Sequence, residues 1–392
     1  MDLTEFYTVR TPVLWVSFPA SLSHSSLSRI KRCPLRFQLE RSEFPDIGRF
    51  PTRPNPAAVE GAIVHECLEA LFKAFSIAGH PELGGERARV CSRKVGLTNL
   101  IQRKSDEACN QFLRHPRGVG FKPRTSVHQL ANKVIRLFRQ QYVSMEPGAP
   151  QSEPESHLGS RQLPDLTDLI GWLASCGTLT ELGLRHPQFP FEGVIDLVCR
   201  RNGETVIVDY KAGSYDPAHR LQVMRYALLW WRITGQVPGC MEIQYLTEKI
   251  SEHVTEYDLL EIERELKFEI DAAATSLEST PANASPGDHC GYCDVRQFCD
   301  GYWKDGTSML RSRSGFADVE LLVNGEPSEH GFHAATIAGT AVKVTSSSDV
   351  GKLQFRGISN GQRLRMIGVR LDASNSEIQV NAAAEIWRMR DV

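Results

Sequence analysis

The sequence predicts an α/β protein in which a mixed central β-sheet is flanked by helices, followed by a small all-β, barrel-like domain. Two observations support this fold class. Strand-like runs at 178–184, 191–211 and 242–246 alternate with long amphipathic helices. After Gly315, short segments of alternating hydrophobicity are joined by turns of Ser, Asn and Gly, which is the rhythm of a small β domain.

The length and composition are those of a globular chain with more than one core. At 392 residues the chain exceeds the usual size of a single domain. We expect an α/β domain over residues 1–309 and an all-β domain over 310–392. The net charge of −2 gives no overall basic signature, so any nucleic-acid contact must come from local basic patches.

Nothing in the sequence indicates a membrane or secreted protein. No apolar run approaches the roughly 20 residues of a membrane span. The N-terminal segment lacks the basic and apolar stretches of a secretory signal. The ten cysteines are unevenly spread, unlike those of a small disulfide-bonded domain. We therefore expect a cytoplasmic protein with no membrane partner, some of whose cysteines bind metal.

The N-terminal half is predicted to be mainly helical. Residues 23–33 form a short capped helix, and 57–75 form a long amphipathic one. A helical insertion is expected over about residues 77–165. It contains an amphipathic helix at 130–145 and a loop rich in Pro, Ser and Gly at 146–164.

The next part of the chain alternates strands and helices. The expected elements are a strand at 178–184, a hairpin at 191–211, a helix at 217–234, a strand at 242–246 and a helix at 257–277. Asp216 is suited to cap the first of these helices, Pro217 to its first turn and Gly235 to its exit.

The hairpin contains the first group of candidate functional residues. Asn202 and Gly203, between two β-branched runs, are a strong signal for a two-residue turn. Such a turn places Asp196 opposite Asp209, with Lys211 on the same face. Facing Cβ atoms lie about 4.5–5.5 Å apart, where like charges repel. A divalent cation between the carboxylates would remove the repulsion, and the lysine suits phosphate chemistry.

Other polar residues are candidates to join this group. Glu181, on the preceding strand, either adds a carboxylate or is simply solvated. His65 ends a Gly61–His65 segment; a lone helix histidine is more often structural, yet one imidazole among oxygens suits manganese as well as magnesium. Gln222 and Tyr226 share a helix face, which can position phosphate, water or a base, or can be merely polar.

A cysteine trio near the end of the α/β domain is a strong metal signal. Cys290, Cys293 and Cys299 lie within ten residues and include CxxC spacing. Four thiolates are the usual complement of a cubane 4Fe-4S iron–sulfur cluster or of a structural zinc. Cys33 is the candidate for the fourth ligand, and the choice between iron–sulfur and zinc stays open.

Together these motifs resemble the RecB-like branch of the PD-(D/E)XK nuclease superfamily. Within it they resemble the iron–sulfur exonucleases, such as the CRISPR-associated RecB-family exonuclease and the nuclease domain of AddB. The matching elements occur in order over about residues 20–302: Cys33-Pro34, Gly61 to His65, Gly193 to Asp196, Asp209 to Lys211, Gln222 to Tyr226, and the cysteine trio. The resemblance implies a prokaryotic, Mg²⁺- or Mn²⁺-dependent deoxyribonuclease with a restriction-endonuclease-like core.

The resemblance also implies roles for individual residues. His65, Asp196 and Asp209 would hold the metal, with the carbonyl of Tyr210 as a further ligand. Lys211 would orient or activate the attacking water.

Further roles and partners follow from the same resemblance. Gln222 and Tyr226 would shape the DNA-binding side of the site. The cysteine cluster would be structural and would tie the two ends of the domain together. The DNA would be single-stranded or a duplex end, and repair, recombination and phage defence are all compatible. Because no Walker-type loop is present, a helicase or other protein is expected to act in trans.

The predicted β domain lies outside the resemblance. An OB-like or related barrel can bind single strands or dock proteins, and both uses remain open. Its aromatic residues Phe316, Phe332, Phe355 and Trp387 can stack on bases or fill the barrel. The alternative for the whole chain is a non-catalytic DNA-binding or scaffold subunit of a helicase–nuclease or defence complex. The intact Asp196, Asp209 and Lys211 argue against it.

Overall fold

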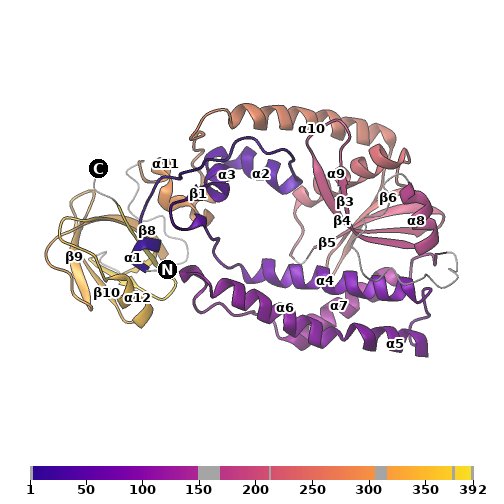
Figure 1. Ribbon diagram of the computed structural model, residues 1–392, viewed down its shortest axis with the longest axis horizontal. Coiled ribbons are helices and arrows are strands. Elements are labelled where there is room, and N and C mark those ends of the chain that lie inside the picture. Colours follow the sequence, from indigo (N-terminus) through magenta and orange to yellow (C-terminus); the bar gives the residue numbers. More distant parts are fainter. Residues whose placement is uncertain (1–2, 149–167, 212, 305–315, 373–375, 390–392) are drawn as a thin grey trace.

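The computed structural model describes residues 3–148, 168–211, 213–304, 316–372 and 376–389. An α/β domain forms one end of the molecule and a β barrel the other (Figure 1). The predicted fold class is confirmed: a mixed sheet is flanked by helices, and a small barrel follows. The expected domain boundary near residue 309 and most of the expected loop at 146–164 lie outside the described residues.

The central sheet has five strands in the order β3-β4-β5-β6-β7. Their bounds are β3 (Thr178–Arg185), β4 (Glu192–Arg201), β5 (Glu204–Tyr210), β6 (Cys240–Gln244) and β7 (Lys249–His253). Neighbouring strands are antiparallel except for β5 and β6, which run parallel. A parallel pair needs a crossover, and α9 (Pro217–Thr234) supplies it. The order leaves β3 and β7 at the edges of the sheet.

The β4–β5 hairpin has the turn and the register that the sequence predicts. Asn202 and Gly203 have φ values of 49° and 79°, the pair of positive values that a type I′ turn requires. The ladder then runs from Arg201 opposite Glu204 to its last pair, Leu197 opposite Val208. The next residues along the two strands are Asp196 and Asp209, so the two aspartates stand where the ladder ends.

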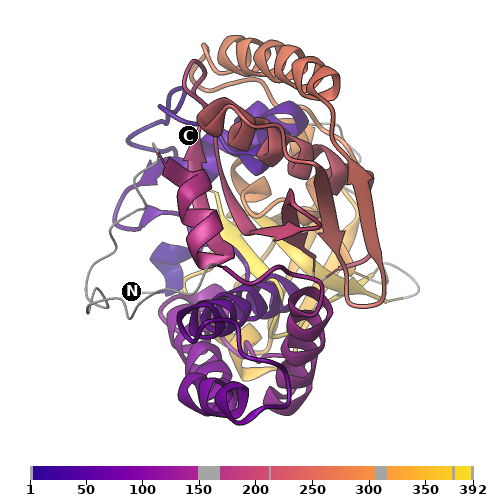
Figure 2. The same cartoon turned by 90° about the vertical axis from the view of Figure 1, so that its right-hand side faces the viewer.

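Helices cover both faces of the sheet (Figure 2). One face packs against α4 (Pro56–Ile77), which is backed by α5 (Glu86–Val95), α6 (Leu97–Phe112) and α7 (Val127–Tyr142). The other face packs against α9, α10 (Glu256–Ser276) and α2 (His24–Arg32). The described part of the 77–165 segment is therefore helical and thickens one layer. None of the described helices is long and apolar enough to cross a membrane.

The remaining elements are short. They are α1 (Leu3–Phe6), α3 (Pro34–Arg41), β1 (Glu43–Phe44), β2 (Gly48–Arg49), η1 (Pro116–Gly118), α8 (Leu169–Cys176), η3 (Asp288–Tyr292), η4 (Arg296–Phe298) and α11 (Asp300–Lys304). Of the cysteine trio, Cys290 lies in η3, Cys293 directly follows η3 and Cys299 directly follows η4.

The C-terminal domain is a closed barrel of five strands with a sixth attached. Its members are β8 (Phe316–Val323), β9 (Gly331–Thr336), β10 (Ala341–Ser346), α12 (Asp349–Gln354), β11 (Arg363–Leu371), β12 (Glu377–Val380) and β13 (Glu385–Arg388). The ring runs β8-β9-β10-β12-β11 and back to β8, and β13 pairs with β11. Phe332 and Phe355 are 3% exposed and fill the barrel, and Trp387 is fully buried, so these three rings do not present a base-stacking surface.

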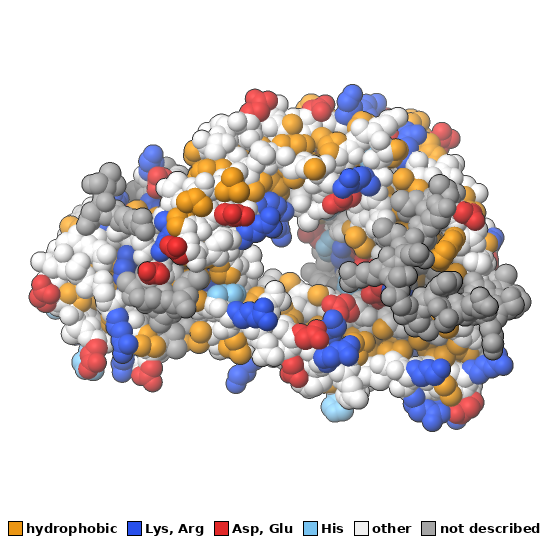
Figure 3. Space-filling model, viewed as in Figure 1, with side chains coloured by type: hydrophobic (Ala, Val, Ile, Leu, Met, Phe, Trp, Pro, Cys, Tyr) orange, Lys and Arg blue, Asp and Glu red, His pale blue; other side chains and the backbone are white. Residues whose placement is uncertain are grey.

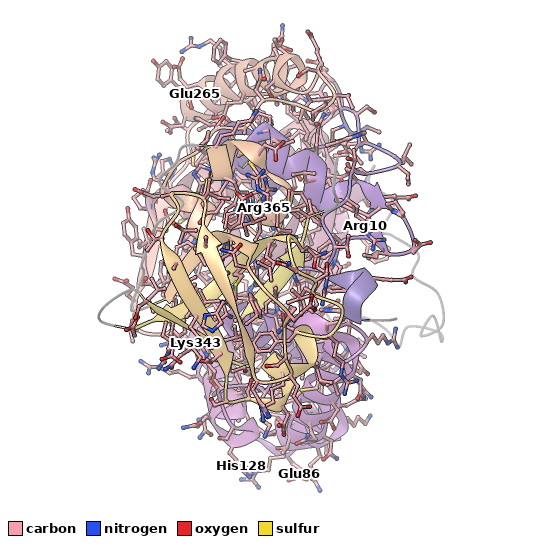
Figure 4. All side chains as sticks on the ribbon, turned by 90° about the vertical axis from the view of Figure 1, so that its left-hand side faces the viewer. Arg10, Glu86, His128, Glu265, Lys343 and Arg365 are labelled. Atoms are coloured by element: carbon pink, nitrogen blue, oxygen red, sulfur yellow. The ribbon has the colours of Figure 1, made fainter. Side chains whose placement is uncertain are left out.

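The barrel, the cysteine segment and the first residues of the chain share one apolar core. Phe6, Tyr7, Cys290, Cys293 and Trp387 are all buried members of it. A polar contact reinforces the join, because Arg365 of β11 donates a hydrogen bond of 2.6 Å to the carbonyl of Gln297. Figure 4 views the molecule from the barrel end and labels Arg365. The barrel is therefore packed against the α/β domain rather than tethered to it.

A buried ion-pair network lies at the same join. The Glu385 carboxylate, 4% exposed, accepts hydrogen bonds from Arg53 Nη2 at 2.8 Å and from Arg117 Nη2 at 3.0 Å. Burial alone would raise the pKa of Glu385, but the two guanidinium groups outweigh burial and lower it to about 2. Arg53 precedes α4 and Arg117 follows α6, so one barrel carboxylate holds two segments of the α/β domain.

We expect Glu385→Gln to lower the free energy of unfolding by about 3 kcal/mol at neutral pH, because it leaves buried Arg117 without its counter-charge. The folded pKa lies below the ordinary value of 4.5, so the stabilisation is full above about pH 5 and is lost as the pH falls toward 2. Denaturant unfolding at several pH values measures this. Exposed Glu329→Gln on the same barrel is the matched control. An equal loss of stability at pH 7 and pH 3 would contradict the assignment.

Candidate functional site

Three carboxylates come from neighbouring strands at one end of the sheet. Thr180 pairs with Leu197 and Leu182 with Ile195, so Glu181 on β3 stands opposite Asp196 on β4. The hairpin register likewise puts Asp196 opposite the Asp209 position on β5. The three acids therefore form a row across the strands, and like charges in such a row are unfavourable unless cations balance them.

A histidine from the facing helix completes a compact group. His65 of α4 lies with Nδ1 3.3 Å from Asp196 Oδ1, and its Nε2 is 3.0 Å from the carbonyl oxygen of Tyr210. His65, Glu181 and Asp196 each offer a ligand atom, and these atoms lie within 4.8 Å of one another. One imidazole and two carboxylates are a donor set that Mn²⁺ or Mg²⁺ accepts.

Asp209 stands beside this group but is paired differently. Its side chain is buried, and its Oδ2 forms an ion pair with the Lys211 ammonium at 2.8 Å. Lys211 Nζ donates to Gln222 Oε1 at 2.8 Å, and Gln222 Nε2 donates to the Tyr226 hydroxyl at 2.6 Å. A continuous polar chain thus runs from the carboxylate row to α9.

The electrostatics show that the carboxylates outnumber the nearby positive charges. Burial and then the neighbouring Asp196 raise the pKa of Glu181 to about 7. Burial and Asp196 also raise the pKa of Asp209, and Lys211 offsets only part of this. Burial disfavours the charged form of His65, but the hydrogen bond to Asp196 and the charges of the three carboxylates together outweigh burial and raise the pKa. A divalent cation would supply the positive charge that this cluster lacks.

The backbone departs from regular geometry at Glu181. Its φ is 48°, in the left-handed region that residues with a side chain seldom adopt. Such a conformation costs of the order of 1–3 kcal/mol and persists only where the surroundings impose it. The β3–β4 ladder is interrupted at this residue and resumes at Leu182. The irregular residue is therefore the one whose carboxylate joins the cluster.

Small residues keep space open around the cluster. A cavity of about 470 Å³ is lined by Ala57, Ala58, Gly61, Ala62, His65, Glu66, Glu69, Glu181, Tyr210 and Lys211. The first turns of α4 thus contribute only Gly and Ala to the cavity, and His65, Glu66 and Glu69 follow them along the helix. Gly193 serves a different purpose on β4, because a Cβ there would come within 2.6 Å of the Tyr226 ring. That close contact explains why a glycine precedes Asp196 by three residues.

Sequence reasoning missed one group that borders the site. A second cavity of about 450 Å³ beside Gln222 and Tyr226 is also lined by Ser23, His24 and Ser25. Burial and then the charge of Arg225 lower the pKa of His24 to about 4, so the imidazole is neutral at physiological pH. In the sequence these residues indicated only a helix cap. Their place beside α9 depends on packing between segments about 200 positions apart.

The four candidate cysteines come together at the join with the barrel. Cys33, Cys290 and Cys293 are buried, and Cys299 is half-buried. The amide of Arg36 donates to Cys33 Sγ at 3.4 Å, and that of Gly287 to Cys290 Sγ at 3.3 Å. Backbone amides at Val295 and Tyr302 donate to the other two sulfurs. Each sulfur thus faces at least one N–H donor, the environment that stabilises a cluster-bound thiolate.

The cysteine group offers four thiols, which is the ligand number of a cubane iron–sulfur cluster and of a structural zinc alike. Its arrangement does not by itself select one metal over the other.

Comparison with known proteins places the motifs in a family. A model of the PD-(D/E)XK nuclease superfamily matches residues 21–300. No curated protein matches the chain. Among solved structures, one titled "Crystal structure of SSO0001" shares 12% sequence identity, with a TM-score of 0.24, over 62% of this chain and 97% of that chain. The family match spans the carboxylate cluster and the cysteine group and stops before the barrel.

We expect Asp196→Asn to weaken Mn²⁺ binding by at least about tenfold, since even residues that only support metal ligands have effects of that size. Glu181→Gln should weaken it as well. Glu69→Gln is the matched control, because Glu69 lines the same cavity without belonging to the close group. Electron paramagnetic resonance of free Mn²⁺ gives the affinities. Unchanged binding in Asp196→Asn would show that the cluster is not the metal site.

Proposed function

Because the chain belongs to the PD-(D/E)XK nuclease superfamily, we propose that it is a metal-dependent deoxyribonuclease acting on single-stranded DNA or duplex ends. Superfamily membership indicates a nuclease. The observation that supports a catalytic role is the convergence of His65, Glu181 and Asp196, with Asp209 and Lys211 beside them, at one end of the sheet. A protein that had lost cleavage would gain nothing from this clustering of like charges.

The proposed metal ligands are His65, Asp196, Asp209 and the carbonyl of Tyr210, with Glu181, the further carboxylate that the sequence offered, as an additional candidate. Two observations support this set: the close grouping around Asp196, and the raised pKa of buried Asp209, which the Lys211 ammonium at 2.8 Å does not fully offset. A divalent ion there supplies an activated water and neutralises the charge that develops on the phosphate.

Lys211 is proposed to orient the attacking water and to stabilise the negative charge that grows on the phosphate oxygens. Asp209 and Gln222 hold its ammonium from two sides, at 2.8 Å each. Holding the group in place beforehand avoids the cost of ordering it during the reaction. Water oxygen bonds to phosphorus, the bond to one ester oxygen breaks, and that oxygen leaves with a proton. Tyr226, fixed by Gln222, would contact the DNA beside this centre.

The surface around the site suits a polyanionic strand. Figure 3 shows that this face of the molecule is hollowed at its centre, with Lys and Arg side chains as well as Asp and Glu side chains around the hollow. The net charge is only −2, so local positive charge rather than the overall field would attract DNA. Within the cell, we propose that a helicase or another protein in trans supplies the strand, in repair, recombination or phage defence.

The cysteine group is proposed to hold a 4Fe-4S cluster of the kind found in RecB-like iron–sulfur exonucleases. Four sulfurs with amide donors support this. A cluster there would join Cys33 to a segment about 260 residues later, and such a link lowers the entropy of the unfolded chain. Its proposed role is structural, because Cys290, Cys293 and Cys299 lie in the apolar core at the join with the barrel.

We expect the protein to cleave labelled DNA with Mg²⁺ or Mn²⁺, and Lys211→Ala to reduce the single-turnover rate by about 100-fold or more. Lys249→Ala is the matched control, because Lys249 is also a sheet lysine paired with a carboxylate, that of Glu242, but lies on the far edge strand. Single-stranded, blunt and flapped substrates should be compared.

Two results would change this proposal. Undiminished cleavage by Lys211→Ala would remove the lysine from the mechanism. Tight DNA binding by the wild-type protein, without cleavage at any concentration of either metal, would favour the alternative of a non-catalytic scaffold subunit.

We expect protein purified without oxygen to be brown and to contain about four irons with matching sulfide per chain. Cys299→Ser should lose iron and unfold at a lower temperature, because the link between the chain segments is lost. Cys109 in α6 is a half-buried cysteine outside the group. Cys109→Ser should therefore keep the iron content and the unfolding temperature of the wild type. Elemental analysis and visible absorption distinguish an iron–sulfur cluster from zinc. One zinc per chain in a colourless protein would replace the iron–sulfur assignment.

A further inference from the structure

Three exposed apolar side chains gather on one cavity next to the carboxylate cluster. Ile77 at the end of α4 is 63% exposed, Trp172 on α8 is 44% exposed and Val194 on β4 is 47% exposed. All three line a single cavity of about 770 Å³. Single apolar side chains on a surface are ordinary, but three from separate elements around one hollow indicate a binding site.

The cavity is continuous with the candidate metal site. Glu69 and Glu181 line both this cavity and the one that contains His65 and Lys211. From Glu181, the wall follows β3 back to Thr178, about 10 Å along the strand. A DNA strand cut at the cluster advances about 3.4 Å per nucleotide when stacked. The cavity is therefore within about three nucleotides of the phosphate that would be cut.

The chemistry of the walls matches a flat group with an apolar face and a polar rim. Trp172, Ile77 and Val194 supply the apolar surface, while Thr178 and Thr180 supply hydroxyls. Because β3 is an edge strand, one row of its backbone donors and acceptors has no strand neighbour. A nucleobase has such a face and rim. The remaining charges in the wall include Lys73, ion-paired with Glu69.

Local structure fixes the tryptophan in place. α8 begins at an Asp168 cap, whose Oδ1 accepts a hydrogen bond of 2.9 Å from the amide of Gly171. A Cβ at Gly171 would lie 2.3 Å from the Asp168 carboxylate, so a glycine is needed for this tight start. Trp172 follows directly, and its indole is presented from a short, capped helix rather than from a loop.

We propose that this cavity receives an unstacked nucleobase of the DNA strand being cut and that Trp172 stacks on it. This inference rests on the proposed nuclease function and adds to it a requirement on the substrate. A base in a duplex is paired and stacked and cannot enter the cavity. The strand must therefore be single at this position, which selects single-stranded DNA or a frayed end over an intact duplex.

The test measures binding of fluorescent single-stranded oligonucleotides without divalent metal, so it does not depend on cleavage. We expect Trp172→Ala to bind about tenfold more weakly and Trp172→Phe to retain most of the affinity. Phe268→Ala is the matched control, because Phe268 is also a solvent-exposed helix aromatic, 74% exposed, on α10. Circular dichroism and thermal unfolding establish that each variant folds.

A series of oligonucleotides with one abasic residue at successive positions identifies the base. In the wild-type protein, one position should weaken binding about tenfold. The same abasic residue should have no further effect in Trp172→Ala, because the base and the indole lose the same contact. Additive losses, or Trp172→Ala binding like the wild type, would overturn the proposal and leave the cavity for a partner protein's side chain. If these binding results are obtained but the protein does not cleave DNA, the nuclease function is contradicted and the base-binding cavity is not.

Discussion

The repulsion among three carboxylates set in register across adjacent strands is the constraint on which the rest of this structure depends. Glu181, Asp196 and Asp209 are held in a row by backbone pairing that extends far beyond them. The raised pKa values of Glu181 and Asp209 measure how little positive charge is available to balance them. His65 from α4 and Lys211 from the end of β5 offset part of the negative charge. The small residues of α4 leave space in which a cation could offset the rest.

The second constraint is long-range and joins the two ends of the chain. The cysteine group, the first residues and Trp387 of the barrel share one apolar core. Within it, Glu385 binds Arg53 and Arg117 from two different parts of the α/β domain. Loss of either the thiolate group or the ion pairs would disturb the same join. The barrel therefore has a structural connection to the α/β domain, whatever it binds at its outer surface.

The sequence predicted correctly those features that depend on a few neighbouring residues, such as turns and helix ends. Asn202-Gly203 fixed the hairpin register, and Asp216, Pro217 and Gly235 fixed the ends of α9. The edge strand β7 was missed, because its formation depends on pairing with β6 along its whole length. Motif order brought His65, Asp196 and Lys211 to the same region. Glu181 was an open candidate and belongs to the close group. The pairing of Asp209 with Lys211 outside that group was not predicted, since side-chain pairing depends on distances that motif spacing does not encode.

The irregularity at Glu181 links the catalytic proposal to the substrate proposal. A regular β3 would pair with β4 at Glu181 as it does on either side of this residue. The left-handed conformation at Glu181 interrupts the ladder there, and Glu181 together with Glu69 lines both cavities. One strained residue thus stands beside Asp196 and at the boundary between the candidate metal site and the cavity that Trp172 lines. Strain of this kind persists only when other interactions compensate for it, so the folding energy of the sheet maintains the geometry on which both proposals depend.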